Sequence, residues 1–353
     1  MKIDYVHFYT RNVAKIKNWF VDNIGFQTVG SSQNRHTQTE AIALNAACLV
    51  FSAPLTIKSQ VNQYLKNHPS GAIDIAFRVT NLTSIVRRAE SLGLNIIQSP
   101  RIKQSFEGVF RYAKIQGWNE LEHTLIEKIE GQLDYAVPDL VDSLQPILNY
   151  HNSALTKIDH VVLNVAAGQL KAAVELYQIL FGFKIQQSFK IDTHKSGLYS
   201  QALVDETGEV KFNINEPTTQ NSQIQEFIDL NHGSGIQHLA LRSQNLIADV
   251  RRMQQHQIQF LTVPPSYYHN LDNSLALSPQ EKAAIATHQI LVDSELGRVN
   301  SPSPPLLMQI FTKPIFEQPT FFLEFIERKR EAQGFGKGNF KALFEAVERE
   351  QLQ

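Results

Sequence analysis

The hydrophobic positions of the chain repeat one order of elements. Residues 3–9 alternate between apolar and polar positions, and the apolar residues of 16–24 then recur at helical spacing. Alternation with a period of two predicts a strand, and recurrence every three or four residues predicts a helix. The same order returns at residues 157–162 and 170–181. Each run ends at a glycine followed by phenylalanine, which predicts the end of a helix in both places.

Each half contains a second strand and helix of this kind. They lie at residues 72–79 then 81–92, and at residues 236–243 then 245–256. Short alternating segments between them, such as 201–204 and 210–214, predict antiparallel strands joined by turns. Four strand–helix–strand–strand–strand units therefore account for most of the chain. This pattern predicts an α+β fold built from tandem βαβββ modules, two in each half.

The segments outside these units predict a linker and a set of additions to the second half. Residues 131–154 contain two prolines and no clear period, so we place a linker there and domains at 1–150 and 151–353. Ser278–Pro279–Gln280–Glu281 has the form of a capping box that opens a short helix. Strands are expected around 306–312 and 320–327. A final helix beyond three closely spaced glycines, with Phe340 on its apolar face, is expected to act as a lid.

The two halves carry related sequences that differ at positions able to bind a metal. Residues 71–78 and 235–242 align without a gap, and the paired positions are 164 residues apart. His238 in the second copy corresponds to Asp74 in the first, and Tyr5 stands where His160 stands. A duplication in which only one copy carries the imidazoles suggests that one half kept a site and the other kept the scaffold. We therefore look for chemistry in the second half.

Composition narrows the class of partner. The chain has 353 residues, enough for two domains, and 42% of them are hydrophobic and 19% charged, as in ordinary globular proteins. Its 33 basic residues nearly balance 34 acidic ones, which argues against nucleic acid or an anionic membrane as partner. The longest nearly apolar run, 41–51, is far shorter than the roughly 20 residues of a membrane span. The single cysteine, Cys48, fits a reducing cytoplasm, so we expect a cytoplasmic protein with a small-molecule partner.

Three residues of the second half are candidate metal ligands: His160, His238 and Glu324. Each histidine lies in the first strand of its unit, so pairing of these strands would bring both imidazoles to one concave face. Glu324 lies among aromatic residues, where a buried carboxylate needs a partner such as a cation. Two imidazoles and one carboxylate suit an octahedral Fe(II) with open positions, or a four-coordinate zinc ion, and ligand type alone does not separate these metals.

The first half offers no such set. Leu125–Ile126–Glu127 is similar to Phe322–Leu323–Glu324, but Tyr5 and Asp74 stand in place of the histidines. We therefore expect no metal in the first half.

A series of motifs in the second half resembles the 4-hydroxyphenylpyruvate dioxygenases of the vicinal oxygen chelate superfamily. The resemblance runs in order from about 157 to 351, whereas the first half is similar mainly in architecture. The motifs are Ile158–Asp159–His160–Val161–Val162, Ile214–Asn215–Glu216–Pro217, Ser222–Gln223–Ile224–Gln225, Gly235–Ile236–Gln237–His238, Val263–Pro264, Tyr267–Tyr268, residues 309–314, Phe322–Leu323–Glu324 and residues 334–340. Any one of these is weak evidence, and their shared order is strong evidence.

The resemblance implies a fold, a cofactor and a reaction. Each domain would be a curved, half-open β-barrel, and His160, His238 and Glu324 would hold Fe(II). The enzyme would convert 4-hydroxyphenylpyruvate and O2 to homogentisate and CO2 by decarboxylation, ring hydroxylation and side-chain migration. Polar and aromatic residues around the substrate would be Ser200, Asn215, Gln223, Gln237, Gln309, Phe311, Phe322, Phe335 and Phe340. No catalytic residue beyond the metal ligands and these substrate residues is implied.

Alternatives remain open within and outside this class. Asn213 stands where the family usually has proline, which would favour the benzylic hydroxylation of 4-hydroxymandelate synthases if it tilts the ring. An extradiol ring-cleaving dioxygenase, a glyoxalase-type isomerase and a non-catalytic ligand-binding protein share the scaffold. We also expect a homo-oligomer, dimer or tetramer. The pathway served, tyrosine breakdown or prenylquinone and tocopherol synthesis, is not indicated by the sequence.

Overall fold

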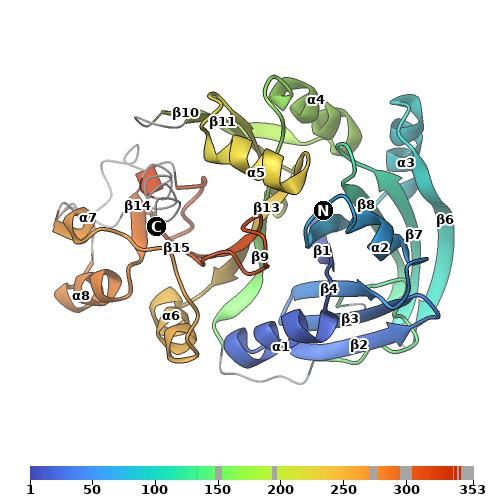
Figure 1. The fold of residues 1–353 in the computed structure, drawn as a ribbon, viewed down its shortest axis with the longest axis horizontal. Helices are drawn as coiled ribbons and strands as arrows, with labels where there is room; N and C mark the ends of the chain where they lie inside the picture. The colour runs from blue at the N-terminus through green and yellow to red at the C-terminus, as the bar shows by residue number, and fades with distance from the viewer. Residues whose placement is uncertain are drawn as a thin grey trace.

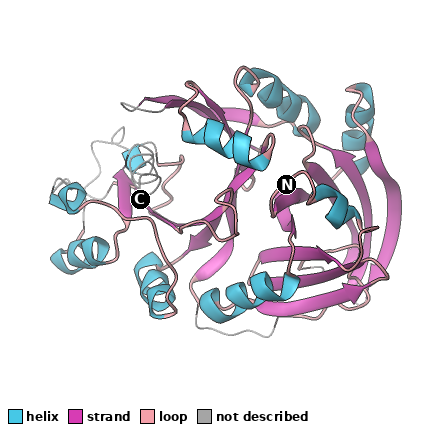
Figure 2. Cartoon of the chain, viewed as in Figure 1, coloured by secondary structure: helices cyan, strands magenta, loops and turns pink. Residues whose placement is uncertain are grey.

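The chain folds into two curled β-sheets, one in each half. The computed structural model describes residues 1–105, 107–132, 134–147, 153–192, 197–269, 277–294, 304–336, 338–339 and 342. The sheets lie side by side, with the first half in blue and teal and the second in green to red (Figure 1). Strands dominate both halves, and the helices lie around them (Figure 2). The described part of the chain thus has the α+β architecture that the sequence predicts.

The first sheet has the strand order β2-β3-β4-β1-β5-β8-β7-β6. Its elements are β1 (Lys2–Tyr9), α1 (Val13–Ile24), β2 (Gln27–Gln33), β3 (Thr37–Leu44), β4 (Ala47–Pro54), α2 (Gln60–Tyr64), β5 (Gly71–Arg78), α3 (Leu82–Ser91), β6 (Ile96–Ser105), β7 (Gly108–Gln116) and β8 (Glu122–Gly131). Two βαβββ modules meet where β1 and β5 pair antiparallel. The predicted module order is therefore confirmed in the first half.

The second sheet repeats this order as β10-β11-β12-β9-β13-β16-β15-β14. Its elements are β9 (Leu155–Asn164), α4 (Leu170–Phe181), β10 (Lys184–Asp192), β11 (Gly197–Val204), β12 (Lys211–Pro217), α5 (Gln223–Asn231), β13 (Gly235–Ser243), α6 (Leu246–Gln255), α7 (Pro265–His269), α8 (Pro279–Thr287), β14 (Leu291–Ser294), β15 (Leu306–Phe311) and β16 (Phe322–Lys329). β9 pairs antiparallel with β13, and β13 pairs parallel with β16. These three central strands carry the three candidate ligands.

The predicted helix ends are present. Gly25 and Gly182 follow α1 and α4 in the left-handed conformation, with φ of 99° and 75°, which glycine adopts without strain. Ser278 and Glu281 form the predicted capping box of α8, in which each side chain bonds the other residue's backbone N–H.

The outer faces of the two sheets share one hydrophobic core. Val161 and Leu163 of β9 belong to the same buried cluster as Phe8 of β1 and Phe77 of β5. Period-two alternation turns every second residue of these strands to the opposite, inner face. The residues on the inner face of each sheet therefore do not contribute to this shared core.

The inner face of the first sheet is filled by the segment that the sequence assigns to the linker. Tyr135, Val137, Leu140 and Leu144 are buried in one cluster with inward residues of the sheet such as Tyr5. These apolar side chains fill the interior of the first sheet. In the second half, the three candidate ligands lie on the corresponding inner face. The domain boundary near 150 stays a prediction, because residues 148–152 lie outside the described part of the chain.

Three expectations are limited by what the structure describes. Most of the expected final helix, with Phe340, lies outside the described residues. Within the described ranges, helices are all too short or too polar to cross a bilayer. The homo-oligomer stays a prediction, since a single chain is present.

Candidate metal centre and substrate pocket

The three candidate ligands meet on the inner face of the second sheet. His160, His238 and Glu324 are almost fully buried, and one ligand atom from each lies within 4.8 Å of the others. Glu324 Oε2 is 3.2 Å from His160 Nε2 and 3.5 Å from His238 Nε2. Strand register explains the convergence, because Ala240 of β13 pairs with both His160 and Glu324.

This donor set fits one metal ion. Bonds of about 2.1 Å would put adjacent ligand atoms of an octahedral ion about 3 Å apart, close to the separations here. The Nδ1 atom of His160 faces Asp159 Oδ1 at 3.0 Å, and that of His238 faces Gln237 Oε1 at 3.3 Å. An acceptor at Nδ1 fixes the tautomer that leaves Nε2 free to ligate. Both free Nε2 atoms are directed at the Glu324 carboxylate.

The electrostatics of the triad favour a cation. Burial would raise the pKa of Glu324, but the two imidazoles lower this pKa to about 2, so the carboxylate is ionised at neutral pH. Burial lowers the pKa of His238. Burial acts in the same direction on His160, but the carboxylate of Glu324 raises the pKa of that ring overall. A buried negative charge between two imidazoles needs a positive partner, and a bound metal supplies it.

A buried ion pair orients His160. Arg328 donates from Nε to Asp159 Oδ2 at 2.8 Å and from Nη2 to Asp159 Oδ1 at 2.6 Å. Burial would raise the pKa of Asp159, but the Arg328 guanidinium holds this pKa well below its usual value. The ionised Asp159 then accepts from the His160 ring. Arg328 also donates to the carbonyl oxygens of Ala332 and Gly334. These two bonds connect the segment after β16 to His160 through Arg328 and Asp159.

A second chain of hydrogen bonds reaches Glu324 from the C-terminal segment. Gln309 donates to Glu324 Oε1 at 2.8 Å, and its own oxygen accepts from Asn339 at 2.8 Å. Asn339 in turn accepts from the Tyr267 hydroxyl at 3.2 Å. Gly336, with a φ of 74°, passes so close that a Cβ atom there would lie 2.0 Å from Gln309 Oε1. Gly336 and Asn339 are therefore held against Gln309, which contacts the carboxylate ligand.

The other polar residues named by the sequence have different surroundings. Ser200 of β11 pairs in register with Asn215 of β12, and both are buried. Ser200 Oγ and Asn215 Oδ1 have no hydrogen-bond partner in the described ranges. Gln223 is buried at the start of α5, and Gln237 contacts His238 as given above. The first two are thus oriented for a ligand, and Gln237 supports a metal ligand.

Three of the four predicted phenylalanines surround the triad. The Phe322 ring stacks on His238 with centroids 4.7 Å apart, and Phe311 lies edge-on to His238 at 6.3 Å. Phe335 lies edge-on to His160 at 5.4 Å and is buried. Phe340 lies outside the described residues. Apolar rings therefore pack against both histidines.

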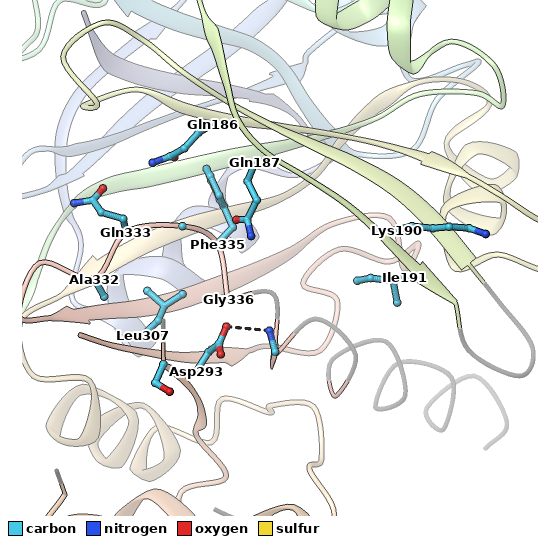
Figure 3. A pocket seen from close by; sticks show the side chains of 13 residues that line it. Gln186, Gln187, Lys190, Ile191, Asp293, Leu307, Ala332, Gln333, Phe335 and Gly336 are labelled. Carbon is cyan, nitrogen blue, oxygen red and sulfur yellow. Dashed lines mark hydrogen bonds between the residues drawn. The ribbon is translucent and has the colours of Figure 1, made fainter. Parts of the chain in front are cut away.

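A cavity of about 770 Å³ lies next to Phe335. It is lined by the edge strands β10 and β14 and by residues 332–336, and Phe335 borders it (Figure 3). The triad itself is not part of the lining, and Phe335, which lines the cavity, also packs edge-on against His160. Phe335 thus contacts both the cavity and a candidate metal ligand.

The first half corrects one alignment made from the sequence. Asp74 pairs with Glu122 and Phe77 with Leu125, whereas the corresponding His238 pairs with Phe322. Thr124, and not Glu127, therefore stands in the place of Glu324. Glu127 matches Glu327 instead, because each accepts the first backbone N–H of the helix that follows the neighbouring strand: Leu82 of α3 after β5, and Leu246 of α6 after β13. The similarity of Leu125–Ile126–Glu127 to Phe322–Leu323–Glu324 therefore suggested a register that is wrong by three residues.

The positions that match two of the ligands hold an internal network in the first half. Thr124 donates to both carboxylate oxygens of Asp74, at 2.8 Å from its backbone and 2.5 Å from its side chain. Lys114 lies 3.2 Å from the same carboxylate. A lysine thus supplies the positive charge that the second half would take from a metal ion.

Sequence reasoning missed two groups that support the triad. Asp159 was part of a motif without a role, although a carboxylate inside an apolar strand signals a buried partner. Arg328 falls in the charged run Glu327–Arg328–Lys329–Arg330, which reads as a solvated strand end. Inward alternation from Glu324 through Ile326 to Arg328 was the available signal.

Comparisons with known proteins agree with this geometry. Residues 157–276 match the family model of the glyoxalase/bleomycin resistance protein/dioxygenase superfamily. The 4-hydroxyphenylpyruvate dioxygenases of Yarrowia lipolytica and Caenorhabditis elegans are each 32% identical to the chain, over 370 and 372 residues. Each alignment covers 99% of this chain and 91% of the relative. An uncharacterized protein of Synechocystis is 33% identical over 350 residues, covering 99% of this chain and 97% of that protein.

Solved structures with the same fold include two of different activity. A variant of 4-hydroxymandelate synthase from Streptomyces coelicolor superposes with a TM-score of 0.87 and 25% identity, covering 99% of this chain and 98% of that one. A Mn(II)-bound glyoxalase from Novosphingobium aromaticivorans has a TM-score of 0.56 at 11% identity, over 94% and 82% of the two chains, and shares the fold alone. The vicinal oxygen chelate fold, with two half-barrels, is therefore confirmed.

Proposed function

Because the chain belongs to the 4-hydroxyphenylpyruvate dioxygenase family, we propose that it is an Fe(II) enzyme that converts 4-hydroxyphenylpyruvate and O2 to homogentisate and CO2. The observation that carries the proposal is the buried set of His160, His238 and Glu324, with ligand atoms within 4.8 Å of one another. Fe(II) bound there supplies open positions for a 2-oxo acid and O2 and the redox chemistry of the reaction.

The protein's own residues bind and orient the substrate. Ser200 Oγ and Asn215 Oδ1, which have no hydrogen-bond partner among the described residues, offer a hydrogen-bonding pair for the phenol hydroxyl. Neutral hydroxyl and amide groups suit this task because they hold a phenol without introducing a charge. The rings of Phe311, Phe322 and Phe335 exclude water around the metal ligands. Gln223 is assigned to the same polar network.

Removal of one ligand tests the metal site. We expect His238→Ala to reduce retained iron to a small fraction of one ion per chain, because two donors hold a ferrous ion weakly. The far-ultraviolet circular dichroism spectrum should stay unchanged, since the ring contributes little to the shared core. His256→Ala, at an exposed helix end, is the matched control. Tight iron binding and normal turnover in His238→Ala would refute the assignment.

Metal dependence and product identity test the reaction. Oxygen uptake with 4-hydroxyphenylpyruvate should require added Fe(II), and Zn(II) should not replace it. A second candidate is 4-hydroxymandelate formation, which the high structural similarity to a 4-hydroxymandelate synthase variant favours. Chromatography of the product separates the two: homogentisate supports the dioxygenase and 4-hydroxymandelate supports the alternative. Absence of uptake under all metals would contradict both.

A further inference from the structure

The inner face of the second sheet contains a buried amide that the proposed function does not use. Asn213 of β12 has no exposed surface, and within the described ranges neither its Oδ1 nor its Nδ2 atom has a hydrogen-bond partner. Buried polar groups nearly always have partners, because an unpaired amide away from water costs free energy. A ligand or a fixed water is therefore expected at this side chain.

Strand register locates this amide near the metal site. Asn213 pairs with Val162 of β9, and Val162 pairs with His238 of β13. Neighbouring strands lie about 4.8 Å apart, so two strand spacings of roughly 10 Å separate Asn213 from His238. This spacing is comparable with the full length of an arylpyruvate, from its chelating 2-oxo acid group to the far edge of its ring. Asn213 is therefore at the depth of the ring.

Asn213 has one small neighbour and two polar neighbours on the inner face of the sheet. Asn215 is the next inward residue of the same strand, and its Oδ1 also has no partner among the described residues. Ala202 of β11 lies beside Asn213 in register and carries only a methyl group. On the far side of Ala202, in the same row, lies Gln187 of β10, which lines the cavity beside Phe335 (Figure 3). Its Oε1 has no hydrogen-bond partner in the part of the chain that the structure describes.

The hydrogen-bonding capacity exceeds the need of one phenol. A single hydroxyl donates one hydrogen and accepts at most two, which Ser200 and Asn215 can satisfy. Asn213 then still offers its amide nitrogen as a donor group and its amide oxygen as an acceptor. Consecutive inward residues of a strand lie about 6.6 Å apart at Cα, so Asn213 and Asn215 can reach adjacent carbons of one ring. A second hydroxyl beside the first would pair with both atoms of the Asn213 amide.

We propose that Asn213 forms a subsite for a second ring hydroxyl, so that the enzyme selects 2-oxo acids with a 3,4-dihydroxyphenyl ring. This inference rests on the proposed function, since it takes the 2-oxo acid to be held at His160, His238 and Glu324. Asn213 acts here as a specificity residue and has no part in the chemical step.

The test compares two substrates in the wild type and in Asn213→Leu. With iron-loaded full-length protein, kcat/KM is measured by oxygen uptake for 3,4-dihydroxyphenylpyruvate and 4-hydroxyphenylpyruvate. Wild-type kcat/KM should be higher for the dihydroxy compound, and the ratio of the two values should fall about tenfold or more in the variant, because only the dihydroxy ring loses its amide partner. Leucine has the same branched shape and number of side-chain heavy atoms as asparagine, and it removes a polar group that has no partner among the described residues, so the melting temperature without substrate should not fall. Ile214→Val, on the outer face of the same strand, is the control.

Direct binding separates failure of this inference from failure of the proposed function. Dissociation constants of both compounds are measured by calorimetry without oxygen, in the wild type, Asn213→Leu and Asn213→Ala. If 4-hydroxyphenylpyruvate is turned over but both compounds lose affinity equally in the variants, Asn213 holds a fixed water and the inference is wrong. The inference is equally wrong if the wild type binds the dihydroxy compound no better. If neither compound is turned over, the proposed function fails, and the binding preference still decides the role of Asn213.

Discussion

At the scale of the residue, Gln309 connects the metal site to the C-terminal segment. Its amide donates to Glu324 Oε1 and to the Phe335 carbonyl oxygen, and it accepts from Asn339. One side chain therefore orients a metal ligand and fixes the segment that carries Phe335. Groups that orient metal ligands affect metal affinity even when they never touch the ion.

We expect Gln309→Leu to weaken Fe(II) binding by about 10- to 100-fold, the usual effect of losing such an orienting group. The cause is that Glu324 keeps its charge and loses the donor that sets its carboxylate plane. Competition with a metal chelator measures the dissociation constant. Gln225→Leu removes a surface amide bonded to Asp229 and serves as the control. Unchanged iron affinity in Gln309→Leu would show that the Glu324 orientation does not depend on Gln309.

Residue chemistry also explains how far the sequence could predict the site. His238 was identifiable because its counterpart in the duplication is Asp74, and Glu324 because a carboxylate among aromatic residues is costly without a partner. The role of Arg328 could not be read from the sequence. Its charged neighbours predict a solvated position, and its burial depends on pairing with Asp159, 169 residues earlier. Contacts between distant strands decide such roles, and local patterns do not contain them.

At the scale of the element, β16 connects the ligand to the segment that covers it. Its inward residues are Glu324, Ile326 and Arg328, so one strand presents a metal ligand and the guanidinium that orients another ligand through Asp159. Arg328 also holds the Ala332 and Gly334 carbonyl oxygens just before Phe335. Displacement of Phe335 is therefore coupled to the His160 environment through this strand.

We expect Arg328→Lys to loosen this coupling, since lysine keeps the charge but cannot make the two-pronged bond to Asp159 while holding both carbonyl oxygens. Backbone amides of residues 332–336 should exchange with deuterium at least tenfold faster, and Fe(II) should bind more weakly. Hydrogen-exchange mass spectrometry with and without iron measures both effects. Lys329→Arg, on the neighbouring residue, is the control. If exchange at 332–336 stayed slow in Arg328→Lys, the segment would be held by other contacts.

At this scale, the periodicity of the sequence predicted the helices and strands well. It predicted less well which segments pack against each other. The βαβββ order, the glycine helix ends and the capping box of α8 follow from patterns within a few residues. The burial of residues 135–144 inside the first half does not, because the prolines and lack of period indicate only an irregular segment. An irregular backbone can still bury apolar side chains, and the sheet that receives them lies far away in sequence.

At the scale of the whole molecule, the two halves meet through a buried histidine. His123 of β8 faces the Ile75 carbonyl oxygen from Nδ1 at 3.1 Å and the Tyr177 hydroxyl of α4 from Nε2 at 3.0 Å. Phe77, Phe181 and Phe212 surround the ring. With its Nδ1 hydrogen donated to a carbonyl oxygen, the neutral ring accepts from Tyr177 at Nε2. The contact between halves thus requires an uncharged imidazole.

This requirement predicts that acid weakens the protein. Burial lowers the pKa of His123 to about 4, although the Ile75 carbonyl oxygen and Asp74 act in the opposite direction. The unfolded chain, with a histidine pKa of about 6.5, binds more protons between these two values, so the free energy of unfolding falls as pH drops from about 6.5 to about 4. Integration from pH 7 to pH 5 gives a loss on the order of 2 kcal/mol from this group.

His123→Gln should therefore reduce the difference in unfolding free energy between pH 7 and pH 5 by about that amount. Urea denaturation of the metal-free protein at a series of pH values measures it. The free energy of unfolding should still fall with decreasing pH in this variant, because burial also lowers the pKa of His7, to about 3. Tyr177→Phe removes the bond to Nε2 and keeps the titrating ring, so it should lower stability at pH 7 and retain the pH dependence. An undiminished slope in His123→Gln would mean that acid acts elsewhere, and that the contact between the halves does not depend on the charge of this imidazole.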